Sequence, residues 1–143
     1  MIYLRALLIL MLGCIGALAD LTVKLTPGSQ LANRGTETIF SGTLTNSGTT
    51  DIFLNDLSFD FIAPAATYFT VDKNFFFENV PGVLSPGETY SGPIFKVAVS
   101  KAPSGTYFGA ASILGGVDIF TQGSLPAVNF SVQIVHRPPK RVR

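Results

Sequence analysis

Cysteine, histidine and tryptophan are nearly or wholly missing from this chain, which has one, one and none of them in 143 residues. Cys14 lies near the N-terminus, so the chain beyond it has no disulfide and no thiol chemistry. His136 stands beside a basic C-terminal run, where no third group would hold it as a catalytic base. The sequence also contains no nucleophile elbow, phosphate-binding loop or His/Cys metal spacing. We therefore expect a protein that is not an enzyme and that has no catalytic residue, metal site or cofactor.

Positive charge is scarce in the body of the chain. Residues 20–136 carry five Lys or Arg and nine Asp or Glu side chains, a net charge of −4. A nucleic-acid-binding domain would present a basic face, so nucleic acid is not expected as a partner. Four basic residues gather instead in the last seven positions: Arg137, Lys140, Arg141 and Arg143. We expect residues 137–143 to be a disordered basic tail that contacts acidic partners or surfaces, because Pro138 and Pro139 interrupt any strand and the like charges repel.

Residues 1–19 have the composition of an export signal. Arg5 supplies one positive charge, and the 14 residues from Ala6 to Ala19 are uncharged. Ala17 and Ala19 are small residues at the positions that a signal peptidase reads. The uncharged run is shorter than the roughly 20 residues of a membrane-spanning helix, so no stable membrane span is expected. These features predict cleavage after Ala19 and a mature protein that is secreted, periplasmic or at the cell surface.

Cys14 allows a second interpretation of the same segment. Met11-Leu12-Gly13-Cys14 loosely resembles a bacterial lipobox, in which the cysteine is lipidated and becomes the mature N-terminus. The sequence leaves this alternative open. The scarcity of cysteine in an exported chain favours a bacterial source.

The rest of the chain alternates short β-type runs with Gly, Pro and Asn turn residues, and no window of 11 residues has a convincing helical period. Seven to nine strands at a spacing of about 10–12 residues are typical of a sandwich. We therefore predict an all-β fold, an antiparallel two-sheet immunoglobulin-like sandwich formed by residues 20–136 as one domain. The clearest expected strands are 21–26, 37–45, 51–62, 89–100, 106–114, 117–120 and 127–135.

Alternation within these runs predicts which side chains face the core. Leu21, Val23 and Leu25 share one face of the first strand. Leu44, Ile94 and Val99 are expected to be buried. In the third strand the expected inward residues are Phe53, Leu57, Phe59 and Phe61, with a register shift near Asn55.

Tyr107 follows Gly105-Thr106 at the start of a late strand. In immunoglobulin-like sandwiches a tyrosine at such a place forms a tyrosine corner, in which its hydroxyl bonds to backbone a few residues upstream. The alternative is an ordinary strand aromatic, and the sequence favours neither.

Several segments resemble secreted bacterial β-sandwich domains of the PEP-CTERM type. They are Gly42–Thr49, Leu84–Tyr90, Ser104–Gly109 running to Gly115-Gly116, and Asn129–Val132. The resemblance implies an exported protein with an immunoglobulin-like domain and a sorting tail that is recognised at the envelope. After Val135 the sequence passes through His136 to basic residues with no apolar stretch, so sorting by such a tail is not expected here.

The segment between Pro64 and Pro81 is crowded with aromatic side chains: Tyr68, Phe69, Phe75, Phe76 and Phe77. If the segment is a strand, Phe76 points away from its two neighbours, because side chains alternate. An exposed face would then make Tyr68, Phe69 and Phe76 contacts for a partner or a sugar. The alternative is that the segment crosses between the sheets and buries its rings.

Two functional hypotheses follow. The first is an exported non-enzymatic immunoglobulin-like domain that acts through protein or extracellular-matrix contacts at the cell envelope. The second is a small carbohydrate-binding module that uses Tyr68 to Phe77 to bind an extracellular polysaccharide.

Overall fold

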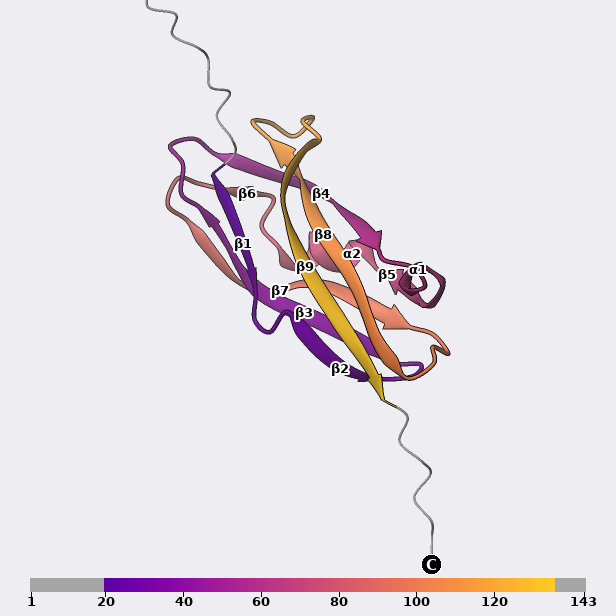
Figure 1. The fold of residues 1–143 in the computed structure, drawn as a ribbon. Helices are drawn as coiled ribbons and strands as arrows, with labels where there is room; N and C mark the ends of the chain where they lie inside the picture. The colour runs from indigo at the N-terminus through magenta and orange to yellow at the C-terminus, as the bar shows by residue number, and fades with distance from the viewer. Residues whose placement is uncertain (1–19, 136–143) are drawn as a thin grey trace, which may run out of the picture.

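The computed structural model describes residues 20–135, so the expected signal (1–19), His136 and the basic tail (137–143) lie outside the described residues. The described chain forms nine strands and two short helices, and the strands build two facing sheets (Figure 1). The elements are β1 Leu21–Leu25, β2 Ser29–Asn33, β3 Glu37–Asn46, β4 Ile52–Phe61, α1 Ala65–Tyr68, β5 Phe69–Val71, α2 Lys73–Asn79, β6 Val83–Leu84, β7 Thr89–Val99, β8 Gly105–Gly116 and β9 Gly123–Val135. The all-β sandwich expected from the sequence is confirmed.

One sheet has the strand order β1-β3-β7-β5 and the other β2-β9-β8-β4-β6. Every pair is antiparallel except β2 with β9, which is parallel. The sandwich is thus antiparallel, as the sequence predicts, except at this pair. Residues 26–28 form a bend that carries the chain from one sheet to the other without reversing its direction. Strand β2 therefore continues in the direction of β1, which is also the direction of β9 (Figure 1).

The core lies between the sheets and centres on three phenylalanine rings. Phe40 and Phe95 come from one sheet and stack with their ring centroids 4.8 Å apart. Phe130 comes from the other sheet and meets both rings at 5.1 Å. Leu44, Ile94 and Val99 are buried, as expected from their strands. Complete burial of each such side chain stabilises the fold by roughly 1.5–3 kcal/mol.

Strand β4 contains the expected register shift, as a bulge between Leu54 and Asp56 opposite β8. Beyond the bulge Leu57 is buried, and Phe59 and Phe61 pack against the core. Before the bulge the buried residues are Ile52 and Leu54, so the expectation that Phe53 faces inward is wrong. The reason is that an extra residue in one strand reverses the alternation on one side of it.

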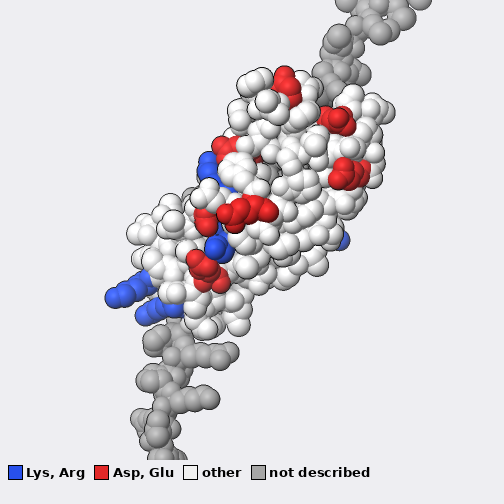
Figure 2. Space-filling view, turned by 180° about the vertical axis from the view of Figure 1, so that it is seen from behind, with Lys and Arg blue, Asp and Glu red and all other residues white. Residues whose placement is uncertain are grey.

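The two ends of the sandwich differ in charge. At one end, which we call the acidic end, the loops 47–51, 85–88 and 117–122 contain acidic residues and no Lys or Arg. At the other, the basic end, the loops 34–36 and 100–104 contain Arg34 and Lys101 and no Asp or Glu. Figure 2 shows acidic side chains at the upper end of the molecule and protruding basic side chains at the lower end.

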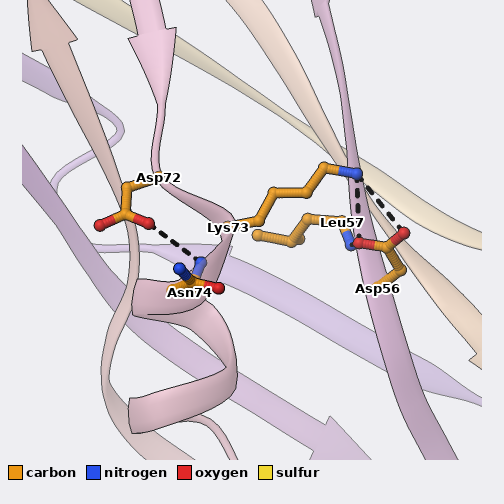
Figure 3. A network of polar contacts seen from close by, with 5 residues as sticks. All are labelled: Asp56, Leu57, Asp72, Lys73 and Asn74. Carbon is orange, nitrogen blue, oxygen red and sulfur yellow. Dashed lines mark hydrogen bonds and ion pairs between the residues drawn. The ribbon is translucent and has the colours of Figure 1, made fainter.

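Residues 62–80, which we call the covering segment, carry both helices and close the side of the sandwich between β4 and β7 (Figure 1). Helix α2 begins where the Asp72 carboxylate accepts a hydrogen bond from the Asn74 backbone N–H at 3.0 Å (Figure 3). An aspartate at this position satisfies one of the free N–H groups of a helix start. The helices have four and seven residues, which is too short for an 11-residue window to detect.

Lys73 joins helix α2 to the neighbouring sheet. Its ammonium lies 3.2 Å from Oδ1 of Asp56 on β4, and the same oxygen accepts a hydrogen bond from the Leu57 backbone N–H at 2.7 Å (Figure 3). Both charged side chains are substantially exposed, so water screens this ion pair and its contribution to stability is small. The covering segment is therefore held mainly by its buried apolar side chains. Among residues 20–135, no helix is long and apolar enough to cross a membrane.

Candidate functional site

The aromatic side chains expected on a contact surface lie mostly in the core. Phe76 is 1% exposed and Phe69 is 6% exposed, so neither ring can meet a partner or a sugar in this structure. Tyr68 is half-buried and packs edge-on against Tyr107, with the ring centroids 5.8 Å apart. Of the two alternatives that the sequence left open, a contact surface of Phe69 and Phe76 is wrong and burial holds for these two rings. The segment crosses from the sheet of β4 to that of β5, and α2 is a helix that turns Phe76 toward the core and leaves Phe77 outside.

Tyr107 lies at the basic end and has a structural role. Its hydroxyl donates a hydrogen bond to the carbonyl oxygen of Pro103, four residues upstream, at 2.7 Å. This is the contact that a tyrosine corner makes. It ties the loop 100–104 to the start of β8, and the ring also packs against Phe69 at 5.5 Å. Tyr107 thus supports the fold rather than a binding surface.

Three exposed apolar side chains lie together in one loop at the acidic end. The sequence predicts a strand over Val117–Phe120, but β8 ends at Gly116 and β9 begins at Gly123. We call residues 117–122 the apolar loop. Val117, Ile119 and Phe120 in it are 76%, 62% and 84% exposed. The loop projects beyond the sheets at the upper end of Figure 1.

Asp118 fixes the shape of the apolar loop from within. Its Oδ1 accepts hydrogen bonds from the backbone N–H groups of Phe120 at 2.9 Å and Thr121 at 2.8 Å. The Thr121 hydroxyl donates to the same oxygen at 2.8 Å. The hydrogen bonds from the Thr121 hydroxyl and the Phe120 backbone hold the pKa of Asp118 below its ordinary value, since they favour the charged carboxylate.

Asn55 holds the apolar loop from outside. Its side-chain amide donates to the carbonyl oxygens of Asp118 and Thr121, both at 2.8 Å. Asn55 sits at the bulge of β4, and bulges commonly re-aim a side chain in this way. The register shift near Asn55 was the only sequence signal of this arrangement. Three apolar side chains are thus held in a defined shape in solvent rather than folded onto the core.

A cleft of about 410 Å³ opens between the two sheets beside the apolar loop. Buried Ile52 and Leu125 contribute apolar lining, and exposed Asp20 and Thr49 contribute polar lining. Val117 belongs to both the cleft and the loop. The cleft is mostly apolar and contains one carboxylate.

Asn46 lies in the cleft wall, but its side-chain amide group already makes hydrogen bonds within the chain. Its amide donates to the carbonyl oxygens of Thr50 at 2.8 Å and Leu84 at 2.9 Å, and its side-chain oxygen accepts from the Gly48 backbone N–H at 2.9 Å. It therefore fixes the turn after β3 and holds β6 against it. Within residues 20–135, no group of three or more His, Cys, Asp or Glu side chains is placed to hold a metal ion.

No family model matches the sequence, and no curated protein matches it either. Three solved structures illustrate what the fold is similar to. The secreted serine protease VesC from Vibrio cholerae is 16% identical with a TM-score of 0.47, over 81% of this chain and 23% of that chain. The ASH/PapD-like domain 7 of human CEP192 is 16% identical with a TM-score of 0.47, over 84% of this chain and 88% of that one. The seventh ScaB type I cohesin from Pseudobacteroides cellulosolvens is 14% identical with a TM-score of 0.39, over 86% of this chain and 97% of that chain.

This chain spans less than a quarter of the length of the protease structure. At these identities and TM-scores the likenesses assign no activity or partner to the chain.

Proposed function

We propose that this protein is an exported, non-enzymatic immunoglobulin-like domain that binds another protein at the cell envelope through the apolar loop. The observation that carries the proposal is the exposure of Val117, Ile119 and Phe120 on a loop whose backbone is fixed by Asn55 and Asp118. The composition of residues 1–19 supports export, and the resemblance to PEP-CTERM domains supports a place at the envelope.

The apolar loop suits a protein partner for two physical reasons. Full burial of a side chain such as Val, Ile or Phe is worth roughly 1.5–3 kcal/mol, so three together supply substantial binding energy. A loop that already holds its bound shape also loses little conformational entropy on binding. Moreover, Asn55 and Asp118 already satisfy backbone groups of the loop, so a partner that excludes water leaves few of them without a hydrogen bond.

The two described clefts do not have the paired acids of glycoside hydrolysis. Hydrolysis of a glycosidic bond usually needs two carboxyl groups that face each other across the substrate. The cleft beside the apolar loop contains only Asp20 as a carboxylate, and a second cleft at the basic end contains only Glu37. Neither described cleft therefore offers the paired acids of that chemistry.

Site-specific photo-crosslinking tests the proposal. A benzoylphenylalanine in place of Phe120 should crosslink to a discrete protein in the envelope of the producing cell. The matched control carries the same group in place of Phe108, which is exposed on β8 away from the loop. Unlabelled protein should compete for the crosslink, and an Ile119→Ser variant should compete poorly. Equal crosslinking from both positions, or equal competition by the variant, would overturn the proposal.

A further inference from the structure

The C-terminal segment, residues 136–143, begins at the end of the molecule that is far from the cleft. Strand β9 runs from Gly123, which lines the cleft, to Val135 at the basic end, and it has 13 residues. At about 3.3 Å per residue the strand is roughly 40 Å long. The C-terminal segment has eight residues and spans at most about 29 Å when fully extended. It therefore cannot reach the cleft of its own molecule.

The charges of the C-terminal segment and the acidic end are opposite. The segment carries Arg137, Lys140, Arg141 and Arg143 and no acidic side chain. The acidic end carries Asp20 in the cleft, with Asp51 and Asp118 in the adjoining loops. Cleavage after Ala19 would add one amino group at Asp20, and the end would still be acidic. Opposite charges at two ends bring molecules together in one orientation and disfavour the reverse.

The polarity of the cleft also fits the C-terminal segment. The segment contains Val142 between Arg141 and Arg143. The cleft places the apolar side chains of Ile52 and Leu125 close to the carboxylate of Asp20. A valine flanked by two cations can fill such a cleft while its neighbours meet the acid. Pro138 and Pro139 restrict the backbone between β9 and Val142, which lowers the entropy cost of docking.

We propose that the cleft binds the C-terminal segment of a second copy of this chain, with Val142 against the apolar wall and the flanking arginines beside Asp20. The basic end of that copy, with Arg34 and Lys101, then approaches the acidic end of the first. The contact joins different surfaces of the two copies, so each copy keeps a free cleft or a free segment. With the copies arranged head to tail, association continues from copy to copy as a row, or as a ring where the rotation between copies closes.

Complementary variants test the proposal with the protein produced through its own leader. One variant, Thr49→Trp, fills the cleft mouth at an exposed position and keeps the C-terminal segment. The other, Lys140→Glu/Arg141→Glu/Arg143→Glu, reverses the segment and keeps the cleft. Sedimentation velocity should show concentration-dependent association of the unaltered protein and a monomer for each variant alone. A mixture should give a species of two copies and nothing larger, because one open cleft meets one intact segment.

Added salt and charge reversal at Asp20 test whether the association depends on charge. Raising the salt from 0.15 to 0.5 M should weaken association, because screening shortens the reach of the charges. Asp20→Lys should raise the dissociation constant about tenfold or more. It should also regain association with the reversed segment, which guards against a Thr49→Trp variant that fails to fold. A protein that is monomeric at all concentrations, or variants that associate as the unaltered protein does, would overturn the inference.

The inference and the proposed function can fail separately. Reversal of the C-terminal segment should abolish association of copies and leave crosslinking from position 120 intact. Ile119→Ser should do the opposite. Loss of both properties in both variants would mean that the apolar loop and the cleft bind one and the same partner copy, which would overturn the proposal of a separate envelope protein.

Discussion

Helix α2 of the covering segment and the turn in the apolar loop are stabilised by the same kind of hydrogen bond, yet their aromatic rings lie in opposite environments. In each, an aspartate accepts a hydrogen bond from a backbone N–H two residues later: Asn74 for Asp72, and Phe120 for Asp118. After Asp72 the chain continues as a helix that closes with a bond from the Val80 N–H to the Phe76 carbonyl at 2.9 Å. After Asp118 the chain returns to a strand at Gly123.

The difference lies in what each segment can pack against. Helix α2 contacts β7 and β4, so Phe76 enters the core. The apolar loop extends past the ends of β8 and β9, where no sheet faces it, so Phe120 stays in solvent. Local hydrogen bonds thus determine the shape of each segment, and the position of the segment in the sandwich determines whether its aromatic rings are buried.

The largest expected effect on stability comes from a substitution that disrupts the packing of the covering segment. Phe76→Ala should lower the free energy of unfolding by about 3–5 kcal/mol, because it empties a fully buried site. Phe77→Ala, on the more exposed side of the same helix with its ring centroid 5.6 Å from that of Phe76, should change it by about 1 kcal/mol. Urea unfolding of the two variants measures the contrast. Equal losses would show that the two sides of α2 are not distinguished in the way described.

A smaller effect is expected at Tyr107, whose ring supports the covering segment. Tyr107→Phe keeps the ring and removes the hydroxyl that bonds to Pro103, which should cost about 1 kcal/mol. Tyr68→Phe makes the same deletion on the neighbouring half-buried ring and should cost less. Thermal unfolding compares the pair, and a greater loss at Tyr68 would contradict the role assigned to Tyr107.

Removal of the Asn55 side chain should loosen the apolar loop and leave the covering segment unchanged. Asn55→Ala takes away the donor to the Asp118 and Thr121 carbonyls and should cost roughly 1 kcal/mol. Hydrogen exchange should speed up at Phe120 and Thr121. The matched control is Asn79→Ala, which removes a 2.8 Å bond to the Phe75 carbonyl in the covering segment. If Asn79→Ala also accelerates exchange in the loop, the two segments are not independent.

The smallest effect is a local dependence on pH. The pKa of Asp118 is lower in the folded loop than in the unfolded chain, so its bonds stabilise the loop above the ordinary aspartate pKa of about 3.9. That contribution should fall away as the pH drops through the lowered pKa and the carboxylate is protonated. Amide NMR shifts of Phe120 and Thr121 should therefore stay constant at neutral pH and move only in acid. A change centred near neutral pH would exclude Asp118 as the cause.

Much of the sandwich could be predicted because period-two alternation reports burial directly. The faces of β1 and the burial of Leu44, Ile94 and Val99 follow from that pattern. Phe53 was misplaced because the alternation reverses at a bulge, and the sequence shows that a shift occurs but not on which side the inward residues change. Strand β2 was missed because Ser29–Asn33 is polar and gains its partner only from a distant part of the chain.

The candidate site could be predicted only in part. Val117–Phe120 has strand-forming residues, but the Asp118 carboxylate competes for the backbone N–H groups that a strand would use. The cleft forms between strands that are far apart in the sequence, with Asp20, Ile52 and Leu125 meeting only in the folded state. Alternation along one strand does not show which residues of distant strands lie together in the folded protein.

The parallel pair of β2 and β9 has a consequence for the order of folding. Ser29 and Ser131, which share a 2.8 Å hydrogen bond between their hydroxyl groups, are 102 residues apart. Strand β2 cannot find its place until β9 has left the ribosome, and contacts of such long range slow folding. The pairing of β2 with β9 therefore completes the five-stranded sheet only after nearly all of residues 20–135 have been made, and this delay suits the export that we propose.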